Sequence, residues 1–132
     1  MKKIACLLTC LILLSSCYKK ELNEIELNQI FLVDSKKYIV CFYSSTCDAC
    51  NKTLEVLDKR YSVRKYEGFL LKTDNLDSIY FGEKRSNLFV GNYQNIVIST
   101  LPYLIFIEER IIVKELFGYI QIHKENLYIF FE

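Results

Sequence analysis

The segment YIVCFYSSTCDACNKTLEVL, residues 38–57, decides the fold. It opens with a compact run of β-branched and aromatic residues at 38–43, which is typical of a strand buried on both faces. The small polar residues at 44–46 predict a turn, and the amphipathic pattern that follows predicts a helix over 47–61. Two cysteines two residues apart therefore stand where a strand, a turn and a helix meet.

This placement of the cysteines suits thiol chemistry. Cys47, at the expected start of the helix, would lie among backbone N–H groups without an intrahelical partner and at the positive end of the helix dipole. Both effects favour the thiolate, which is the nucleophile in disulfide exchange. Cys50 follows one turn later, close enough to attack a mixed disulfide and release the product. We expect Cys47 to be the exposed, attacking sulfur and Cys50 the buried, resolving one.

Two other uses of the pair stay open. A zinc site needs four ligands, and beyond the pair the sequence offers only Cys41 and the single histidine, His123. A copper carrier could use the two thiolates and His123, although we expect His123 to be an ordinary residue at the edge of the last helix. A purely structural disulfide is favoured less, because so short a loop constrains the unfolded chain little.

The first seventeen residues, MKKIACLLTCLILLSSC, form a distinct unit. Two lysines precede an apolar stretch at 4–14 that is too short to span a bilayer, which is the pattern of a secretory signal peptide. Leu14-Ser15-Ser16-Cys17 resembles the bacterial lipobox, whose cysteine is lipidated after the leader is cleaved. The resemblance implies a signal peptide over 1–16 and a lipid anchor on Cys17. The alternative is an ordinary signal peptide that happens to contain this cysteine.

The rest of the composition is that of one globular domain. The chain has 132 residues, of which 52% are hydrophobic, enough for a single core. The formal charge of +1 removes the electrostatic case for a nucleic-acid partner. Once the leader and Cys17 are set aside, Cys41, Cys47 and Cys50 remain as thiols. Outside the cytoplasm disulfides persist, but a pair plus one odd cysteine does not suggest a multiply stapled scaffold.

The residues between these landmarks predict further elements. An amphipathic helix or tether is expected over 21–33, within a lipidated N-terminal segment at 17–36. Gly68 precedes a second strand, expected at 69–73. Residues 74–87 contain turn residues and a poorly formed helix, and 88–99 is ambiguous because Gly91-Asn92 indicates a turn.

The C-terminal third has a clearer pattern. Two apolar runs at 103–107 and 111–117, separated by Glu108-Glu109-Arg110, predict an antiparallel hairpin. Gly118 then precedes a closing helix expected over 120–131. The order of elements indicates an α/β or α+β sheet with helices packed on its faces.

Strand, small polar turn, Cys-x-x-Cys and helix resemble the thioredoxin family. Leu101-Pro102 is a second landmark, because thioredoxin-like proteins carry a cis-proline at this place before the hairpin, against the active-site cysteines. The resemblance covers residues 37–132 and implies an α/β fold, with a thioredoxin-like central mixed sheet of about four strands flanked by helices. It implies a thiol–disulfide oxidoreductase without a bound cofactor, with Cys47 and Cys50 catalytic. Pro102, Leu101 and Thr46 would lie beside the substrate chain.

Three positions depart from the family pattern. Thr46 stands where thioredoxins usually have Trp, and Asp48-Ala49 replaces Gly-Pro between the cysteines. Asp48 should either oppose thiolate formation at Cys47 and favour a more reducing pair, or simply stabilise the helix start. Cys41 occupies the position of a buried acid that is proposed to exchange a proton with the resolving cysteine. We expect Cys41 to be an inert buried thiol, and the loss of the acid argues against fast turnover.

Together these features predict an extracytoplasmic thiol–disulfide oxidoreductase, lipid-anchored to a bacterial membrane on the cell-envelope side. Its substrates would be disulfide- or dithiol-containing proteins, and turnover requires a membrane electron-relay partner. Two alternatives stay open. One is a thioredoxin-fold binding or accessory lipoprotein without redox turnover, and the other, less favoured, is a metal carrier.

Overall fold

A computed structural model describes residues 22–61 and 66–118 of the chain. The signal peptide, Cys17 and the closing helix with His123 lie outside these residues and stay predictions. The elements follow in order as β1 (Asn23–Glu24), the 3-10 turn η1 (Leu27–Gln29), β2 (Lys37–Tyr43), α2 (Asp48–Tyr61), β3 (Glu67–Lys72), the 3-10 turns η2 (Ser78–Tyr80) and η3 (Tyr93–Asn95), β4 (Tyr103–Glu108) and β5 (Ile111–Phe117). Within the described ranges, no helix has the length and apolar character needed to cross a bilayer.

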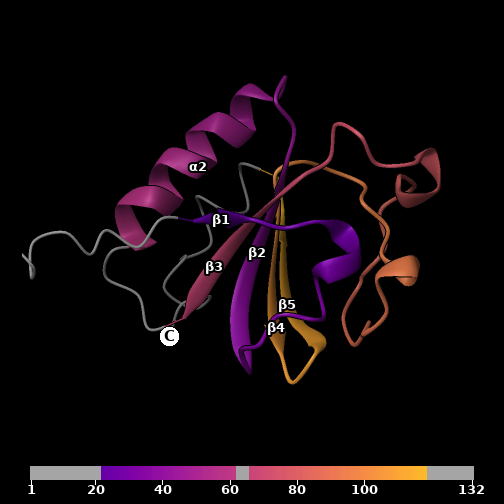
Figure 1. The fold of residues 1–132 in the computed structure, drawn as a ribbon. Coiled ribbons are helices and arrows are strands. Elements are labelled where there is room, and N and C mark those ends of the chain that lie inside the picture. The colour runs from indigo at the N-terminus through magenta and orange to yellow at the C-terminus, as the bar shows by residue number, and fades with distance from the viewer. Residues whose placement is uncertain (1–21, 62–65, 119–132) are drawn as a thin grey trace, which may run out of the picture.

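The strands of the described residues form one mixed sheet in the order β1-β3-β2-β4-β5 (Figure 1). β2 is central and runs parallel to β3, with Cys41 opposite Leu70, and antiparallel to β4, with Cys41 opposite Leu104. β4 returns as β5 through a tight turn, which confirms the predicted hairpin. The sheet has one strand more than expected, because the two-residue β1 pairs in parallel with β3.

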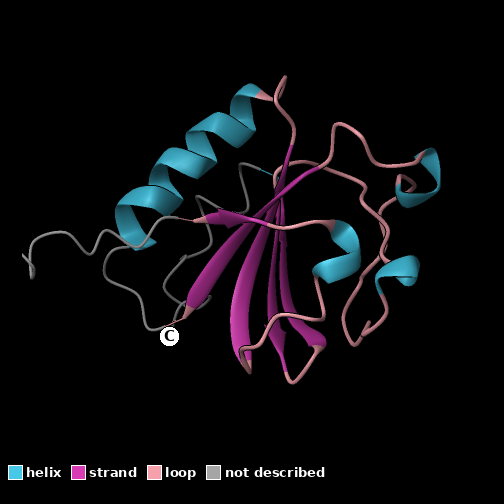
Figure 2. Ribbon diagram, viewed as in Figure 1, coloured by secondary structure: helices cyan, strands magenta, loops and turns pink. Residues whose placement is uncertain are grey.

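Alternation along the central strands places a core on both faces of the sheet. Tyr38, Val40 and Phe42 of β2 belong to one apolar cluster. Ile39 and Cys41 point the other way and belong to a second cluster, which also includes Leu57 of α2. Figure 2 shows the same division, with the long helix on one side of the sheet and the three short helical turns on the other.

The prediction of a helix over 21–33 is wrong. This segment forms β1 and η1 instead, and Leu27, Ile30 and Phe31 are buried in the core. The carbonyl of Ile30 accepts a hydrogen bond from the buried hydroxyl of Tyr38 at 2.5 Å. The mixed spacing of the apolar residues therefore reflects a segment that forms the edge strand of the sheet and then packs on the core. It does not reflect the apolar stripe of a helix. Part of the segment expected as a tether belongs to the folded domain.

The long connection between β3 and β4 is mostly irregular. The poorly formed helix expected within 74–87 is reduced to η2, and the ambiguous stretch at 88–99 contains η3. A backbone bridge pairs Phe81 with Ile98, so the connection folds back on itself.

A buried side-chain network fastens this connection to the hairpin. The Asn87 side chain is fully buried, and its amide nitrogen donates to the Val97 carbonyl at 2.8 Å and to the Tyr103 hydroxyl at 2.9 Å. The Val97 N–H donates to the side-chain oxygen Oδ1 of Asn87 at 2.9 Å. The Tyr103 hydroxyl in turn donates to Glu115 Oε2 of β5 at 2.8 Å. Side-chain hydrogen bonds thus hold this segment where helical packing does not.

Candidate active site

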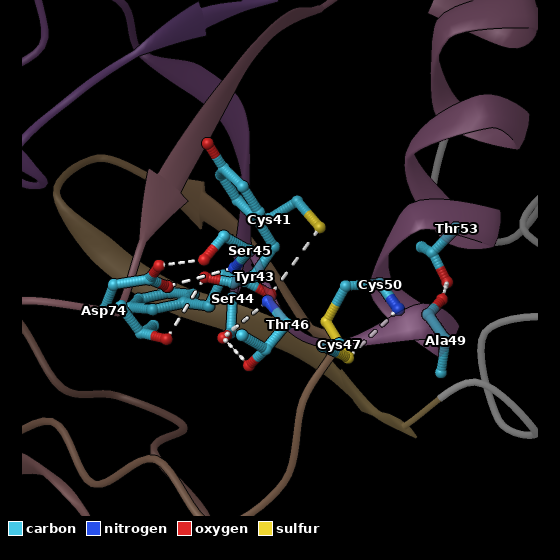
Figure 3. Close-up of a disulfide and its surroundings, with 12 residues drawn as sticks. Cys41, Tyr43, Ser44, Ser45, Thr46, Cys47, Ala49, Cys50, Thr53 and Asp74 are labelled. Carbon is cyan, nitrogen blue, oxygen red and sulfur yellow. Dashed lines mark hydrogen bonds between the residues drawn. A yellow bond between two sulfur atoms is a disulfide. The ribbon is translucent and has the colours of Figure 1, made fainter.

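Cys47 and Cys50 form a disulfide at the N-terminus of α2, with their Cα atoms 5.2 Å apart (Figure 3). Cys47 precedes the helix, and its carbonyl accepts the N–H of Asn51 at 3.2 Å, the first hydrogen bond of α2. The N–H of Cys50 is directed at Sγ of Cys47 at 3.1 Å. After reduction, this donor and the helix dipole would stabilise a thiolate on Cys47.

The two sulfur-bearing residues differ in access to solvent. Cys50 is fully buried, whereas Cys47 is partly exposed. A substrate sulfur approaching from solvent therefore meets Cys47 first. This burial agrees with the expected division into attacking and resolving cysteines, while the roles themselves stay predictions.

The turn that presents Cys47 is held by a carboxylate from the end of β3. The N–H of Ser45 donates to Oδ1 of Asp74 at 3.0 Å, and the Ser45 hydroxyl donates to Oδ2 (Figure 3). Within the turn, the Cys47 N–H donates to the Ser44 carbonyl at 3.3 Å, and the Thr46 hydroxyl lies 3.2 Å from that of Ser44. The hydrogen bonds from the hydroxyl and backbone of Ser45 lower the pKa of Asp74. The turn is thus held by an ionised carboxylate at neutral pH.

Sequence reasoning missed Asp74, although a signal for it exists. Asp74 follows β3, the parallel neighbour of β2, and the carboxyl ends of adjacent parallel strands meet at one edge of a sheet. Thr73 joins the two strand ends, because its N–H and its hydroxyl both reach the Tyr43 carbonyl, at 2.8 and 3.1 Å. The Tyr43 hydroxyl donates to the carboxylate of Glu24 on β1.

Pro102 lies at the same end of the sheet. Tyr103 pairs with Phe42, so Pro102 falls opposite the end of β2, from which the turn leads to Cys47. The Leu101–Pro102 bond is cis, as expected from the resemblance. Pro102 is buried, and Leu101 is partly buried against the core. The fold therefore gathers the predicted site residues at one end, with Thr46 exposed in the turn. Their contacts with a substrate stay predictions.

Cys41 lies away from solvent on β2, in the apolar cluster on the α2 side of the sheet. Burial raises the pKa of its thiol to about 12. Cys41 is therefore a neutral thiol at physiological pH and cannot accept a proton there as a carboxylate would. In the described part of the chain, no three His, Cys, Asp or Glu side chains form a group that could hold a metal ion.

Comparison with known proteins supports the fold through structure rather than sequence. No family model matches the chain, and no curated protein matches it significantly. The reduced thioredoxin pre-protein of Schistosoma mansoni superposes with a TM-score of 0.59 and 17% identity, covering 86% of this chain and 100% of that one. The thioredoxin of Malassezia sympodialis gives 0.56 and 17%, covering 75% and 80% of the two chains. Oxidised mitochondrial thioredoxin 3 of Saccharomyces cerevisiae gives 0.56 and 12%, covering 74% and 84%.

The chain therefore has the thioredoxin-like α/β fold, which confirms the fold class expected from the sequence. Its Cys-x-x-Cys pair is present as a disulfide at the start of the helix.

Proposed function

We propose that this protein is a thiol–disulfide oxidoreductase held on the outer side of a bacterial membrane. One observation carries the redox part of the proposal. The disulfide joins a partly exposed Cys47, at the N-terminus of α2, to a fully buried Cys50. A purely structural crosslink between residues three apart would add little to stability, so the pair is better explained by chemistry.

In the reductive direction, the Cys47 thiolate attacks one sulfur of a substrate disulfide. The substrate S–S bond breaks, its second sulfur leaves as a thiolate, and a mixed disulfide with Cys47 forms. Cys50 then gives its proton to the substrate thiolate released in the first step and attacks Sγ of Cys47, which releases the other substrate sulfur as a thiolate and closes the Cys47–Cys50 disulfide. Two electrons have passed to the substrate, and the oxidative direction is the reverse. A membrane dithiol–disulfide partner would restore the starting state.

Disulfide reduction by the full chain and by three single variants tests this mechanism. With insulin as substrate and dithiothreitol as reductant, we expect Cys47→Ser to reduce the rate to that of dithiothreitol alone. Cys50→Ser, reduced beforehand and freed of dithiothreitol, should accumulate a mixed disulfide between Cys47 and the substrate, visible on a non-reducing gel. Cys41→Ala is the matched control and should keep most of the wild-type rate. A wild-type rate no greater than that of Cys47→Ser would end the proposal.

The membrane anchor is supported by the leader pattern and by Leu14-Ser15-Ser16-Cys17. Expression of the full chain in bacteria fed a radiolabelled fatty acid tests it. We expect label and membrane fractionation for the wild type, and loss of both for Cys17→Ser. An unlabelled, soluble wild-type protein would contradict lipidation without touching the redox proposal.

A second candidate function is binding by the thioredoxin fold without redox turnover. It is favoured by the neutral, buried Cys41 at the position where thioredoxins carry an acid. This candidate predicts normal function in cells when Cys47 and Cys50 are both replaced by serine. Loss of function in that double variant, at normal protein levels, would exclude binding alone and favour the oxidoreductase.

A further inference from the structure

A groove of about 230 Å³ opens on the face of the sheet opposite α2. Two tyrosines and two leucines give it an apolar floor, two carboxylates give it charge, and two asparagines complete the lining. The six residues used below are Leu27, Leu76, Tyr80, Tyr93, Glu26 and Asp77. No predicted site residue lies in it.

The groove adjoins the redox end of the molecule. Its wall at 75–77 continues directly from Asp74, whose carboxylate holds Ser45 in the turn before Cys47. The N–H of Leu76 donates to the Thr73 carbonyl at 3.1 Å, which fixes this wall against the strand end. The wall of the groove and the carboxylate that holds the turn before Cys47 therefore belong to one short stretch of chain, residues 74–77.

The charge on the groove is negative and uncompensated. Glu26 and Asp77 are both exposed, and among the described residues neither has a basic side chain within 4.0 Å. The nearby Lys72 lies 4.0 Å from Asp74 instead. A cation entering the groove therefore meets two carboxylates that, among the described residues, have no basic side chain as a partner, although the Glu26 carboxylate also accepts the backbone N–H of Gln29.

We propose that the groove receives a lysine or arginine side chain of the substrate, from the segment that flanks its reactive cysteine. The proposal rests on the proposed function and specifies its substrate class, a disulfide with basic neighbours. The aliphatic stem of the cation packs on Leu27 and Leu76, as such stems do on apolar surfaces. Its charged head meets the faces of Tyr80 and Tyr93 and pairs with Glu26 or Asp77.

Direct binding tests the groove without any redox step. The probe is a fluorescent peptide in which serine replaces the cysteine and two arginines flank it, compared with a peptide carrying glutamines instead. We expect the full chain in detergent to bind the arginine peptide about tenfold more tightly. This preference should shrink as salt rises from 0.05 to 0.5 M. Equal affinity for the two peptides would overturn the proposal.

Three variants and one control locate the binding. Glu26→Gln and Asp77→Asn should each remove much of the preference for the arginine peptide, and Tyr93→Leu should weaken its binding while keeping the packing against the core. Glu67→Gln is the matched control, because it removes one exposed negative charge from the opposite end of β3. If this control weakened binding as much as Asp77→Asn, the net charge of the protein would explain the preference for the arginine peptide, and the proposed binding in the groove would be overturned.

Reduction of the corresponding cysteine peptides, joined to glutathione through a disulfide, separates this proposal from the proposed function. We expect a higher kcat/KM for the arginine peptide, lowered by Asp77→Asn. Equal reduction and equal binding of the two peptides would overturn the proposed role of the groove and leave the proposed oxidoreductase activity intact. Selective binding of the arginine peptide without reduction of either would uphold the groove and overturn the oxidoreductase.

Discussion

Asp48 is the charged residue between the two cysteines and the first residue of α2, where it is exposed to solvent. Its negative charge beside Cys47 disfavours the thiolate and so stabilises the disulfide relative to the dithiol. We expect Asp48→Asn to raise the reduction potential of the pair by about 10–20 mV, measured by equilibration with glutathione. Asp58→Asn, ten residues further along the helix, should leave the potential unchanged. An unchanged potential with reduced stability would show that Asp48 only stabilises the helix start.

Cys41 should make the stability of the fold depend on alkaline pH. Its pKa rises from 9.0 to about 12 on folding, so between these values the unfolded chain loses a proton that the folded chain keeps. The contribution of the protonated Cys41 thiol to the free energy of unfolding is therefore complete below pH 9 and is lost as pH rises toward 12. Urea unfolding at pH 7 to 10.5, with Cys47 and Cys50 replaced by serine, should show a steeper loss above pH 9 than the same protein with Cys41→Ala. Equal slopes would mean that the thiol is accessible to solvent.

At the scale of elements, the connection between β3 and β4 depends on Asn87. We expect Asn87→Ala to lower the free energy of unfolding by about 2–3 kcal/mol, because it leaves the partly buried N–H of Val97 without its acceptor and the buried Tyr103 hydroxyl without its amide donor. Urea denaturation measures this loss. Asn95→Ala, an exposed change in η3, is the control and should cost far less. A loss equal to that of the control would show that the network adds nothing net.

The local sequence pattern was sufficient to predict those elements whose apolar residues follow the repeat of a strand or a helix. β2, α2 and the β4–β5 hairpin carry apolar runs or stripes that match their final structure, and the cysteine pair and Pro102 stand out by type and spacing. The helix expected over 21–33 failed because its apolar residues pack on partners distant in the sequence. Asp74 meets Ser45 across 29 residues, and no local pattern encodes such a pairing.

The same limit applies to the buried network behind the hairpin. Asn87 reaches Tyr103 across 16 residues, and its N–H donates to Glu115 across 28. Asn87 is a polar residue in a stretch whose sequence looks like an ordinary loop, whereas Tyr103 and Glu115 lie on the strands of the predicted hairpin. Tertiary contact alone decides that they are buried and paired.

At the scale of the whole molecule, the two central strands should be the last part to open. β2 and β4 are buried along almost their full length, whereas β1 has two exposed residues. In native-state hydrogen exchange we expect the amides of Val40 and Ile105 to exchange only through global unfolding, and those between β3 and β4 to exchange through smaller openings. Equal protection in both regions would indicate a single cooperative unit.

On the side of the sheet opposite α2, the described residues form long connections that contain only short 3-10 turns (Figure 2). Surface connections tolerate insertions, deletions and drift in composition far better than strands do. A chain with long connections of this kind can keep the geometry of its strands while its sequence becomes hard to align with those of structurally similar proteins. Distant relatives of this protein should therefore be sought by superposing the strands and leaving the loops out, rather than by comparing sequence identity over the full length.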